Sequence, residues 1–380
     1  MRRVNFIWVI ILLIVTGCGE NKRHGSEIDG FITVDVTAKY PKKELILQDF
    51  MDVEYVALET NDNFLNQGIV RGVGKGIIPV RNRIEDGDIF VFDRNGKALR
   101  KINRKGQGDE EYLYISEVII EEDNNEMFIN DVGKTMVYDL YGNFKRSIRY
   151  MGENMTYMIY NFDKENLIHV SKDREGRQQH AVISKQDGSF VKTIEIPYKE
   201  VKSPILSRTL DGGMIAASVY NYRSIIPNQN SLMLTESSSD TIYRLFADYS
   251  MSPFIIRTPS IQSMEPEVFL FPLMFTKRYY FMECWRKEWG NNLRTNLMYD
   301  SQEKSIYTTT IINDDFLTKK HVEITFATVN NEIAFWKTLE AYELVEAYKK
   351  GELKDGKLKE IASKLNEDDN PVIMLVKYKR

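Results

Sequence analysis

The chain has 380 residues, of which 51 are basic and 55 acidic, so its net charge is −4 at pH 7. This near balance provides no positive field for a polyanion and argues against a nucleic-acid partner. Aromatic residues make up 12% of the chain. Because aromatic side chains suit half-buried strands, we expect a β-rich protein.

The N-terminus has the features of an export signal. Two arginines precede an apolar run over residues 6–15, which is too short to cross a bilayer comfortably. The run leads into Val-Thr-Gly-Cys at residues 15–18, which resembles the bacterial lipobox. Residues 1–17 are therefore predicted to be a lipoprotein signal peptide, with a plain membrane anchor as the alternative. Cys18 would then be the lipidated first residue of the mature chain.

Residues 18–30 are polar and charged and are predicted to be a flexible tether. The lipid would anchor the protein to a bacterial outer membrane, and the choice between its periplasmic and cell-surface faces stays open. If Cys18 carries the lipid, Cys284 is the single remaining cysteine and the folded part has no disulfide. Cys284 lies in an aromatic stretch and is predicted to be a packed thiol.

Three similar segments recur at an interval of 46 residues, each with a glycine in the same place: Gly96, Gly142 and Gly188. Each segment has the pattern of an apolar strand, a tight turn with glycine in the left-handed conformation, and a returning strand. A period in the forties made of hairpins is typical of a β-propeller with one four-stranded blade per repeat. Residues 50–337 leave room for roughly six such repeats.

The predicted propeller domain covers residues 31–380. It begins with a strand over residues 31–36, and its C-terminus changes character, with a helical insertion over residues 338–365. A final strand over residues 371–378 is predicted to close the ring, because an open ring would leave two sheet edges exposed. Our hypothesis is that it pairs with the early strand over residues 53–58. The predicted fold class is therefore all-β, a six-bladed propeller with a short C-terminal helical segment and a closing strand.

Two motifs carry a resemblance to a known family. Residues 90–97 read Phe-Val-Phe-Asp-Arg-Asn-Gly-Lys, and residues 105–112 read Lys-Gly-Gln-Gly-Asp-Glu-Glu-Tyr. The chain resembles the bacterial six-bladed β-propeller lipoproteins, a largely uncharacterised group related in shape to NHL-repeat propellers. That group typically has Gly-Gln-Gly-Pro-Gly-Glu-Tyr at the second motif, where this chain has Asp109 and Glu110 in place of proline and glycine. The resemblance implies an exported propeller and no particular reaction.

The second motif is the best candidate site in the sequence. It lies between two predicted blades, and such connections reach a face of the ring near the central channel. Its glycines permit close approach of a ligand to the backbone, and its charged and polar side chains supply hydrogen bonds. The alternative is a plain connection whose glycines satisfy turn geometry. The predicted ligand-binding residues are Arg104, Lys105, Gln107, Glu111 and Tyr112.

Other motifs predict no chemistry, and the catalytic residues stay unknown. Residues 71–76 are glycine-rich but lack the Gly-Lys-Ser/Thr of a phosphate loop, so they are predicted to be a turn. The four histidines show no ligand spacing, and we predict neither a metal site nor a cofactor. An aromatic stretch over residues 269–289 is predicted to be a core strand, with Trp285 and Trp289 as exposed exceptions.

These features favour a lipid-anchored binding or scaffold module over an enzyme. The expected partners are the membrane, through the N-terminal lipid, and an envelope protein or a glycan or peptide ligand. The alternatives are a propeller lyase or hydrolase with its site at the channel mouth, and a purely structural subunit of an envelope complex. An enzyme should show titratable groups with perturbed pKa values in the channel, whereas a binding module should show an apolar or aromatic patch.

Overall fold

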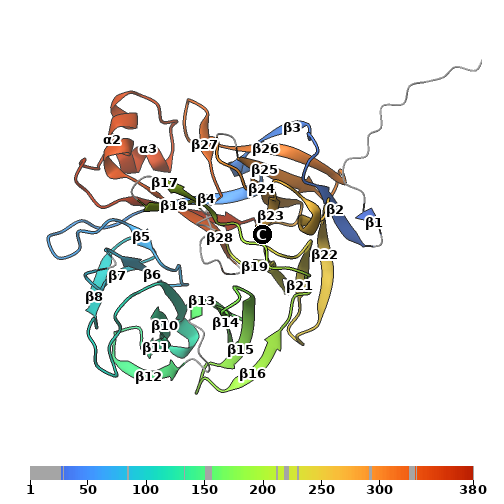
Figure 1. Ribbon diagram of the computed structural model, residues 1–380. Coiled ribbons are helices and arrows are strands. Elements are labelled where there is room, and N and C mark those ends of the chain that lie inside the picture. The colour runs from blue at the N-terminus through green and yellow to red at the C-terminus, as the bar shows by residue number, and fades with distance from the viewer. Residues whose placement is uncertain are drawn as a thin grey trace, which may run out of the picture.

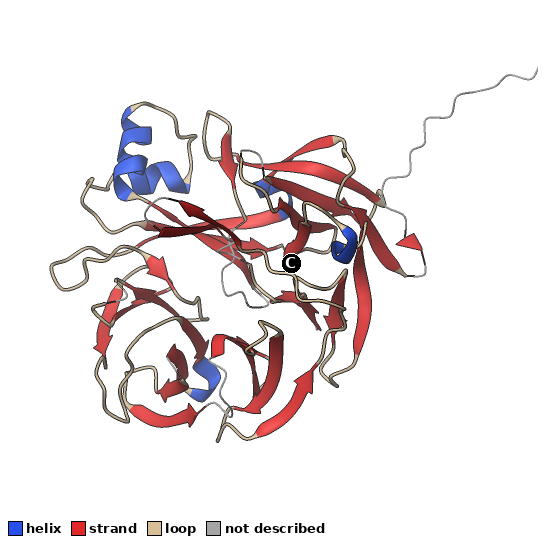
Figure 2. Cartoon of the chain, in the orientation of Figure 1, coloured by secondary structure: helices blue, strands red, loops and turns tan. Residues whose placement is uncertain are grey.

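The β-sheets of this protein follow one another around a ring in chain order (Figure 1). The computed structural model describes residues 27–28, 30–83, 85–131, 133–149, 156–210, 213–217, 222–228, 231–290, 293–324, 330 and 332–379. The predicted signal peptide, Cys18 and most of the predicted tether lie outside these residues. Six sheets form the blades of a β-propeller, as predicted, and Figure 2 shows that strands and loops dominate the chain.

Blades 1 to 3 are four-stranded antiparallel meanders, in which each strand pairs with the next along the chain. Blade 1 consists of β5 (Ile69–Val70), β6 (Ile77–Arg81), β7 (Asp88–Asp93) and β8 (Ala98–Asn103). Blade 2 consists of β9 (Glu117–Glu121), β10 (Glu126–Asp131), β11 (Lys134–Tyr138) and β12 (Phe144–Arg149). Blade 3 consists of β13 (Thr156–Asn161), β14 (Asn166–Lys172), β15 (Gln178–Ser184) and β16 (Phe190–Ile194).

Blades 4 and 5 keep the meander and gain extra strands at their edges, whereas blade 6 has three strands within the described residues. A separate hairpin, β17 (Leu206–Leu210) and β18 (Gly213–Ala217), precedes blade 4. Blade 4 contains β19 (Ile225–Asn228), β20 (Ser231–Leu234), β21 (Thr241–Leu245) and β22 (Met251–Thr258). Blade 5 contains β23 (Val268–Phe275), β24 (Tyr279–Arg286), β25 (Arg294–Asp300), β26 (Ser305–Asn313) and β27 (Lys320–Val322). Blade 6 contains β28 (Ile333–Leu339), β29 (Val372–Tyr378) and β4 (Met51–Ala57).

The N-terminal segment runs along the edges of three blades before blade 1 begins. After the short strand β1 (Glu27–Ile28), β2 (Phe31–Asp35) pairs in parallel with β22 of blade 4. The next strand, β3 (Lys42–Ile46), pairs in parallel with β26 of blade 5. A four-residue helix, α1 (Leu47–Phe50), then leads into β4. Since unpaired edge groups need partners, the segment covers two sheet edges. Strand β1 falls inside the predicted tether, so regular structure begins before residue 31.

The ring closes as the sequence predicts. Strand β29 pairs antiparallel with β4, from Val372 opposite Ala57 to Tyr378 opposite Met51, and it pairs with β28 on its other side. The predicted helical insertion is confirmed as two short helices between β28 and β29, α2 (Ala341–Lys349) and α3 (Lys357–Ala362). No helix in the described part of the chain is long and apolar enough to span a bilayer.

The repeated glycines do what their spacing predicts. Gly96, Gly142 and Gly188 have φ angles of +86°, +87° and +75°, and each hairpin carries a register shift shortly before its turn. Each turn also packs on the preceding blade. A Cβ atom on Gly142 would lie 2.7 Å from the Ile102 side chain, on the outer strand of blade 1. Glycine is therefore required both by the backbone conformation and by the contact between blades.

The core is divided into clusters that lie between neighbouring blades. Strand β7 shows why, because its apolar run serves both faces of a sheet that is buried on each side. Ile89 and Val91 pack with blade 2, whereas Phe90 and Phe92 pack with blade 6. Similar clusters join each of the remaining neighbouring pairs around the ring. The blades are therefore held together mainly by apolar burial between successive sheets.

Candidate functional site

The predicted ligand-binding loop connects β8 to β9 and is braced by its own residues. Tyr112 is fully buried, and its hydroxyl donates to the carbonyl oxygen of Gly87 at 2.7 Å. Burial raises the pKa of Tyr112 to about 12. The Glu111 carboxylate accepts the Gly108 N–H at 2.9 Å, which holds the glycine turn in place. Glu111 and Tyr112 therefore stabilise the loop itself.

The other three predicted side chains are exposed and do not converge on one point. Arg104 reaches outward, where its Nε donates to the carbonyl oxygen of Gly142 at 2.9 Å in the outer turn of blade 2. The Lys105 ammonium contacts the carbonyl oxygen of Glu85 in a different loop. Gln107 is exposed at the tip. The loop brings the five predicted residues into one segment without forming a pocket from them.

The glycine-rich segment over residues 71–76 forms a loop and turn before β6, as predicted. Its backbone amides surround a carboxylate from the neighbouring blade. The N–H groups of Lys75, Gly76 and Ile77 donate to Glu122 at 2.5, 2.8 and 3.0 Å. An arrangement of successive amides that could hold an anion is thus filled by the protein's own side chain. This turn is a contact between blades 1 and 2.

A cluster of arginines lies closer to the axis of the ring. Arg71 directly follows the inner strand β5, and its Nη1 donates to the carbonyl oxygen of Ser116 at 3.3 Å. Arg81 ends β6 and is only 9% exposed, and its Nη1 donates to the carbonyl oxygen of Ile115 at 2.6 Å. Both acceptors lie at the end of the β8–β9 connection. The predicted loop therefore ends beside these two arginines, although its predicted side chains do not reach them.

Arg223, two residues before the inner strand β19 of blade 4, completes the cluster. Its Nη2 lies 3.3 Å from the carboxylate of Glu117, at the start of the inner strand β9 of blade 2. The charge of Arg223 also acts on Arg71 of blade 1. In a ring of six, blades 1 and 4 stand opposite each other, so their side chains can meet only near the axis. We call Arg71, Arg81, Arg223 and Glu117 the channel cluster.

Burial and mutual repulsion shape the electrostatics of the channel cluster. Burial and the charges of Arg81 and Arg223 lower the pKa of Arg71 to about 10, although Glu117 opposes the shift. Burial also lowers the pKa of Arg81. Both groups remain cationic at neutral pH. Within the channel cluster, three arginines lie near the carboxylate of Glu117, and Glu85 and Asp86 also act on Arg81 to raise its pKa.

Three tyrosines continue the site from the channel cluster toward blade 4. Tyr160, on the inner strand β13, is buried next to Arg223, and Tyr157 lies on the same strand with 37% of its surface exposed. The hydroxyl of Tyr222 donates to the carbonyl oxygen of Thr235 at 2.9 Å. Burial raises the pKa values of all three phenols, so they remain neutral hydrogen-bonding groups at physiological pH.

A buried carboxyl lies beside these tyrosines. Glu236 is 5% exposed, and its Oε1 accepts the N–H of Ser238 at 3.1 Å and the hydroxyl of the same serine at 3.0 Å. Its Oε2 has no hydrogen-bond partner among the described residues. Burial raises the pKa of Glu236. The raised value moves this carboxyl toward the range in which it could exchange a proton near neutral pH.

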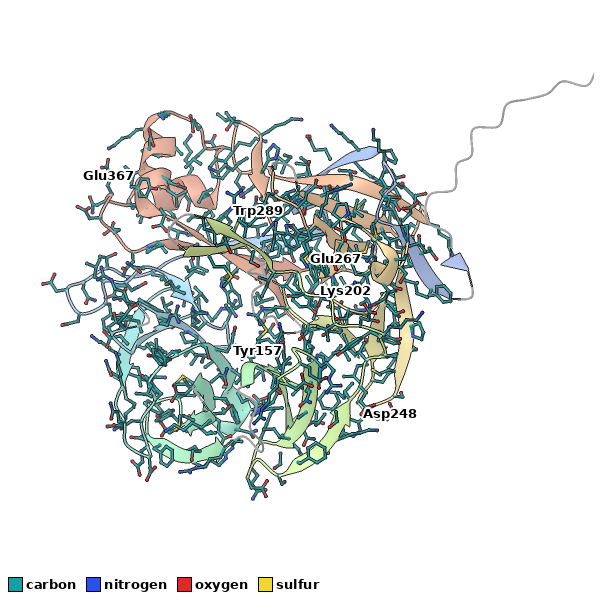
Figure 3. The ribbon with its side chains drawn as sticks, viewed as in Figure 1. Tyr157, Lys202, Asp248, Glu267, Trp289 and Glu367 are labelled. Carbon is teal, nitrogen blue, oxygen red and sulfur yellow. The ribbon has the colours of Figure 1, made fainter. Side chains whose placement is uncertain are left out.

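Figure 3 places Tyr157, Lys202 and Glu267 toward the middle of the ring, with Asp248 and Glu367 far out. Glu267 lies 3.5 Å from the Lys202 ammonium and 2.8 Å from that of Lys287, so this charged group is paired internally. We call the region from the channel cluster through Tyr157 to Lys202 the channel mouth.

The aromatic stretch of blade 5 is mostly core, as predicted. Phe269 and Phe271 are 1% exposed, and Cys284 is a buried free thiol. The prediction that Trp285 is exposed is wrong, because it is 4% exposed and stacks with Phe269 in the same cluster. Trp289 is 40% exposed, as predicted, and lies over the guanidinium of Arg208 at 4.4 Å.

A hollow of about 670 Å³ opens at the other end of the inner strands, where β23 turns into β24. Phe275, Tyr279 and Arg278 are among the side chains that line it. The Arg278 guanidinium donates to the Asp300 carboxylate at 2.7 Å, so this cation is neutralised by the protein. The channel cluster, where three arginines lie near Glu117, is the stronger candidate site.

No group of residues in the described ranges could hold a metal ion. His169 and His180 are buried within blade 3, where burial lowers their pKa values to about 3 and about 4. Both are therefore neutral core residues.

Sequence reasoning missed the channel cluster. Arg71 belongs to the glycine-rich segment that the sequence predicts to be a turn. Arg81 carries a weak signal, since it ends an otherwise apolar strand. Arg223 and Glu117 lie in ordinary polar contexts, 106 residues apart. Nothing in their local patterns indicates that they meet.

One protein-family model covers residues 31–377, almost the whole predicted propeller. The chain belongs to this family. It is described only as a domain of unknown function, DUF4934. No curated protein matches the sequence.

Among solved structures, the chain is similar to a Bacteroides fragilis protein that is described as exported. The two share 17% identity with a TM-score of 0.59, over 89% of this chain and 99% of that one. This likeness shows a shared fold. Virginiamycin B lyase from Staphylococcus aureus matches with 12% identity and a TM-score of 0.36, over 87% of this chain and 100% of that one. A Bacteroides thetaiotaomicron protein of unknown function matches with 9% identity and a TM-score of 0.39, over 90% and 75%.

Proposed function

We propose that this family member is an exported, lipid-anchored binding module that takes its ligand at the channel mouth. The lipobox-like residues 15–18 support the anchor, with Cys18 as the lipidated residue at an outer membrane. The fold shared with a Bacteroides protein classed as exported supports the location. A rigid ring of blades supports a binding role, because its connecting loops can vary without disturbing the core.

The observation that carries this proposal is the arrangement of side chains at the channel mouth, where the Arg223 guanidinium lies 3.3 Å from the Glu117 carboxylate and the buried Tyr160 lies beside Arg223. Tyr157, Tyr160 and Tyr222 have raised pKa values and stay neutral, and Arg71, at about 10, stays charged. Groups whose pKa values lie this far above neutral pH keep their protons and are poor general acids or bases. They remain good hydrogen-bond donors. The channel mouth therefore suits holding a ligand better than transferring protons.

The test is to purify the acylated protein from its native membrane and identify what co-purifies by mass spectrometry. A Cys18→Ala variant should leave the membrane fraction. Tyr157→Ala, at the channel mouth, should lose the bound partner. Tyr141→Ala is the matched control, because Tyr141 is 67% exposed on an outer turn of blade 2. Wild-type protein that captures nothing, or equal losses in both tyrosine variants, would contradict a binding role for the mouth.

The carboxyl group of Glu236 supports a second candidate function, that of an enzyme of the lyase or hydrolase class. Its unpartnered Oε2 and raised pKa are what a general acid or base requires. A screen of glycan and peptide substrates should then reveal turnover that Glu236→Gln abolishes while ligand binding persists. Turnover that is unchanged in Glu236→Gln would remove this carboxyl from any mechanism.

A further inference from the structure

We infer that Arg71, Arg81 and Arg223 form a site for an oxyanion, a carboxylate or a phosphate group, on the axis of the propeller. The inference rests on the proposed function, because it names the ligand class of the same channel mouth. The new element is that the negative charge of the ligand anchors it to the three arginines. The tyrosines would then contact the remainder of the ligand.

The hydrogen-bonding capacity of Arg71 and Arg81 supports this site. A guanidinium has five N–H donors, and each of these two arginines donates from Nη1 to one backbone carbonyl. The Nε of each is buried and has no hydrogen-bond partner within the described ranges. Because a buried donor without a partner is costly, an acceptor that reaches both side chains would be stabilising. An oxyanion offers several acceptor atoms and the complementary charge.

The charge balance around Arg71 points to the same ligand. Two of the groups that shift its pKa are arginines, and the third is the single carboxylate Glu117. Three carboxylates raise the pKa of Arg81, Glu117 and then Glu85 and Asp86 of the loop that follows β6. The positive charge is therefore less compensated at Arg71 than at Arg81. An anion bound there would relieve the repulsion among the three guanidinium groups.

Structural arginines elsewhere in the chain are paired differently. Arg146 makes two hydrogen bonds to the carboxylate of Glu126, at 2.6 and 2.8 Å. Arg278 likewise binds Asp300 through two nitrogens. Each such pair satisfies a guanidinium with a bidentate carboxylate of the protein. Among the described residues, Arg71 makes no such bidentate pair, which is what a site for an external carboxylate or phosphate requires.

Unused donors alone do not define the site, as Arg257 shows. This arginine is 4% exposed, and its Nε and Nη1 also have no partner among the described residues. Asp240 and Cys284 influence its pKa, but no other arginine does. It is therefore a single packed cation beside a carboxylate. The channel cluster differs because three cations from two opposite blades come together there.

Isothermal titration calorimetry of the full mature protein with inorganic phosphate and with succinate, at constant ionic strength, tests the inference. Wild-type protein should bind at least one of the two anions saturably. Arg71→Gln should weaken binding about tenfold by removing a charge-assisted hydrogen bond. Glu117→Gln should strengthen it about threefold to tenfold by removing the competing carboxylate. A gain in affinity cannot be caused by misfolding. Arg149→Gln is the matched control, since its side chain is 80% exposed at the end of the outer strand β12.

The two anions distinguish the sources of the charge. Tighter binding of phosphate would indicate a phosphorylated ligand, and tighter binding of succinate an acidic sugar or peptide. Absence of saturable binding in both wild type and Glu117→Gln, or equal weakening in Arg71→Gln and Arg149→Gln, would overturn the inference. If the wild type binds neither anion yet still loses its membrane partner in Tyr157→Ala, the oxyanion site fails and the proposed binding function stands.

Discussion

Replacing Gly96 with alanine is expected to loosen the contact between blade 1 and the closing strand β4. A Cβ atom at this position would lie 2.0 Å from the carbonyl oxygen of Ala57, the last residue of β4. The obstacle is backbone in a paired strand, so it cannot rotate away as a side chain would. The neighbouring N–H of Glu59 also donates to the carbonyl oxygen of Gly96 at 2.8 Å and resists separation.

The size of the effect follows from a matched pair of turns. Gly176 has a φ of +80° against +86° for Gly96, and in each turn the glycine N–H donates to an aspartate carbonyl at 3.0 Å. A Cβ atom on Gly176 would have its nearest neighbour at 3.9 Å. Alanine in the left-handed region costs about 1–2 kcal/mol in both variants. Overpacking adds about 1–3 kcal/mol for Gly96 alone, giving a total loss of about 2–5 kcal/mol.

The assay is equilibrium unfolding in guanidinium chloride, followed by fluorescence and extrapolated to water. Gly96→Ala should lower the free energy of unfolding clearly more than Gly176→Ala does. Equal losses in the two variants would show that the closing strand moves aside at no cost. That result would refute the reasoning that a rigid contact with β4 holds blade 1 in the ring.

Three further predictions concern the ring and its interior. Deleting residues 371–380 removes the strand between β28 and β4, so thermal stability should fall sharply, and an unchanged melting temperature would contradict closure by this strand. Burial raises the pKa of Cys284 to about 12, so a maleimide should label this thiol only after denaturation, and rapid labelling of folded protein would contradict its packing. Burial lowers the pKa values of His169 and His180 to about 3 and about 4, below the value of about 6.5 in an unfolded chain, so protonation favours unfolding. The stabilising contribution of these two neutral histidines should be complete above about pH 6.5 and lost as the pH falls toward 4. The free energy of unfolding should therefore depend less steeply on pH in His169→Asn than in the wild type.

Much of the fold could be predicted because propeller blades are local structures. The glycine turns at 96, 142 and 188 lie within hairpins whose strands are adjacent in sequence, so periodicity alone predicts them. The closing strand was predictable for a different reason, since an apolar segment beyond the last repeat needs a sheet edge. The parallel strands β2 and β3 were not predicted to cover blades 4 and 5. Their partners are more than 200 residues away, and no local pattern encodes that pairing.

The candidate site was predicted only in part. The glycine-containing loop over residues 105–112 was found from its motif, and the structure places it next to the site through Ile115 and Ser116. Its own side chains instead stabilise the loop itself and its contact with the outer turn of blade 2. Arg71 and Arg81 were missed because an arginine at the end of a strand resembles an ordinary surface residue. Burial and repulsion make them distinctive, and both depend on neighbours from other blades.

The sequence by itself determined the repeat, the left-handed glycine turns, the closing strand and the apolar alternation that gives each blade two buried faces. These are properties of residues close together along the chain, and hydrophobic periodicity and backbone sterics are sufficient to specify them. Only the tertiary structure decided that Arg223 meets Arg71 and Glu117. Closure of the ring brings opposite blades together at the axis, and only there does the concentration of like charge arise that an anion would relieve.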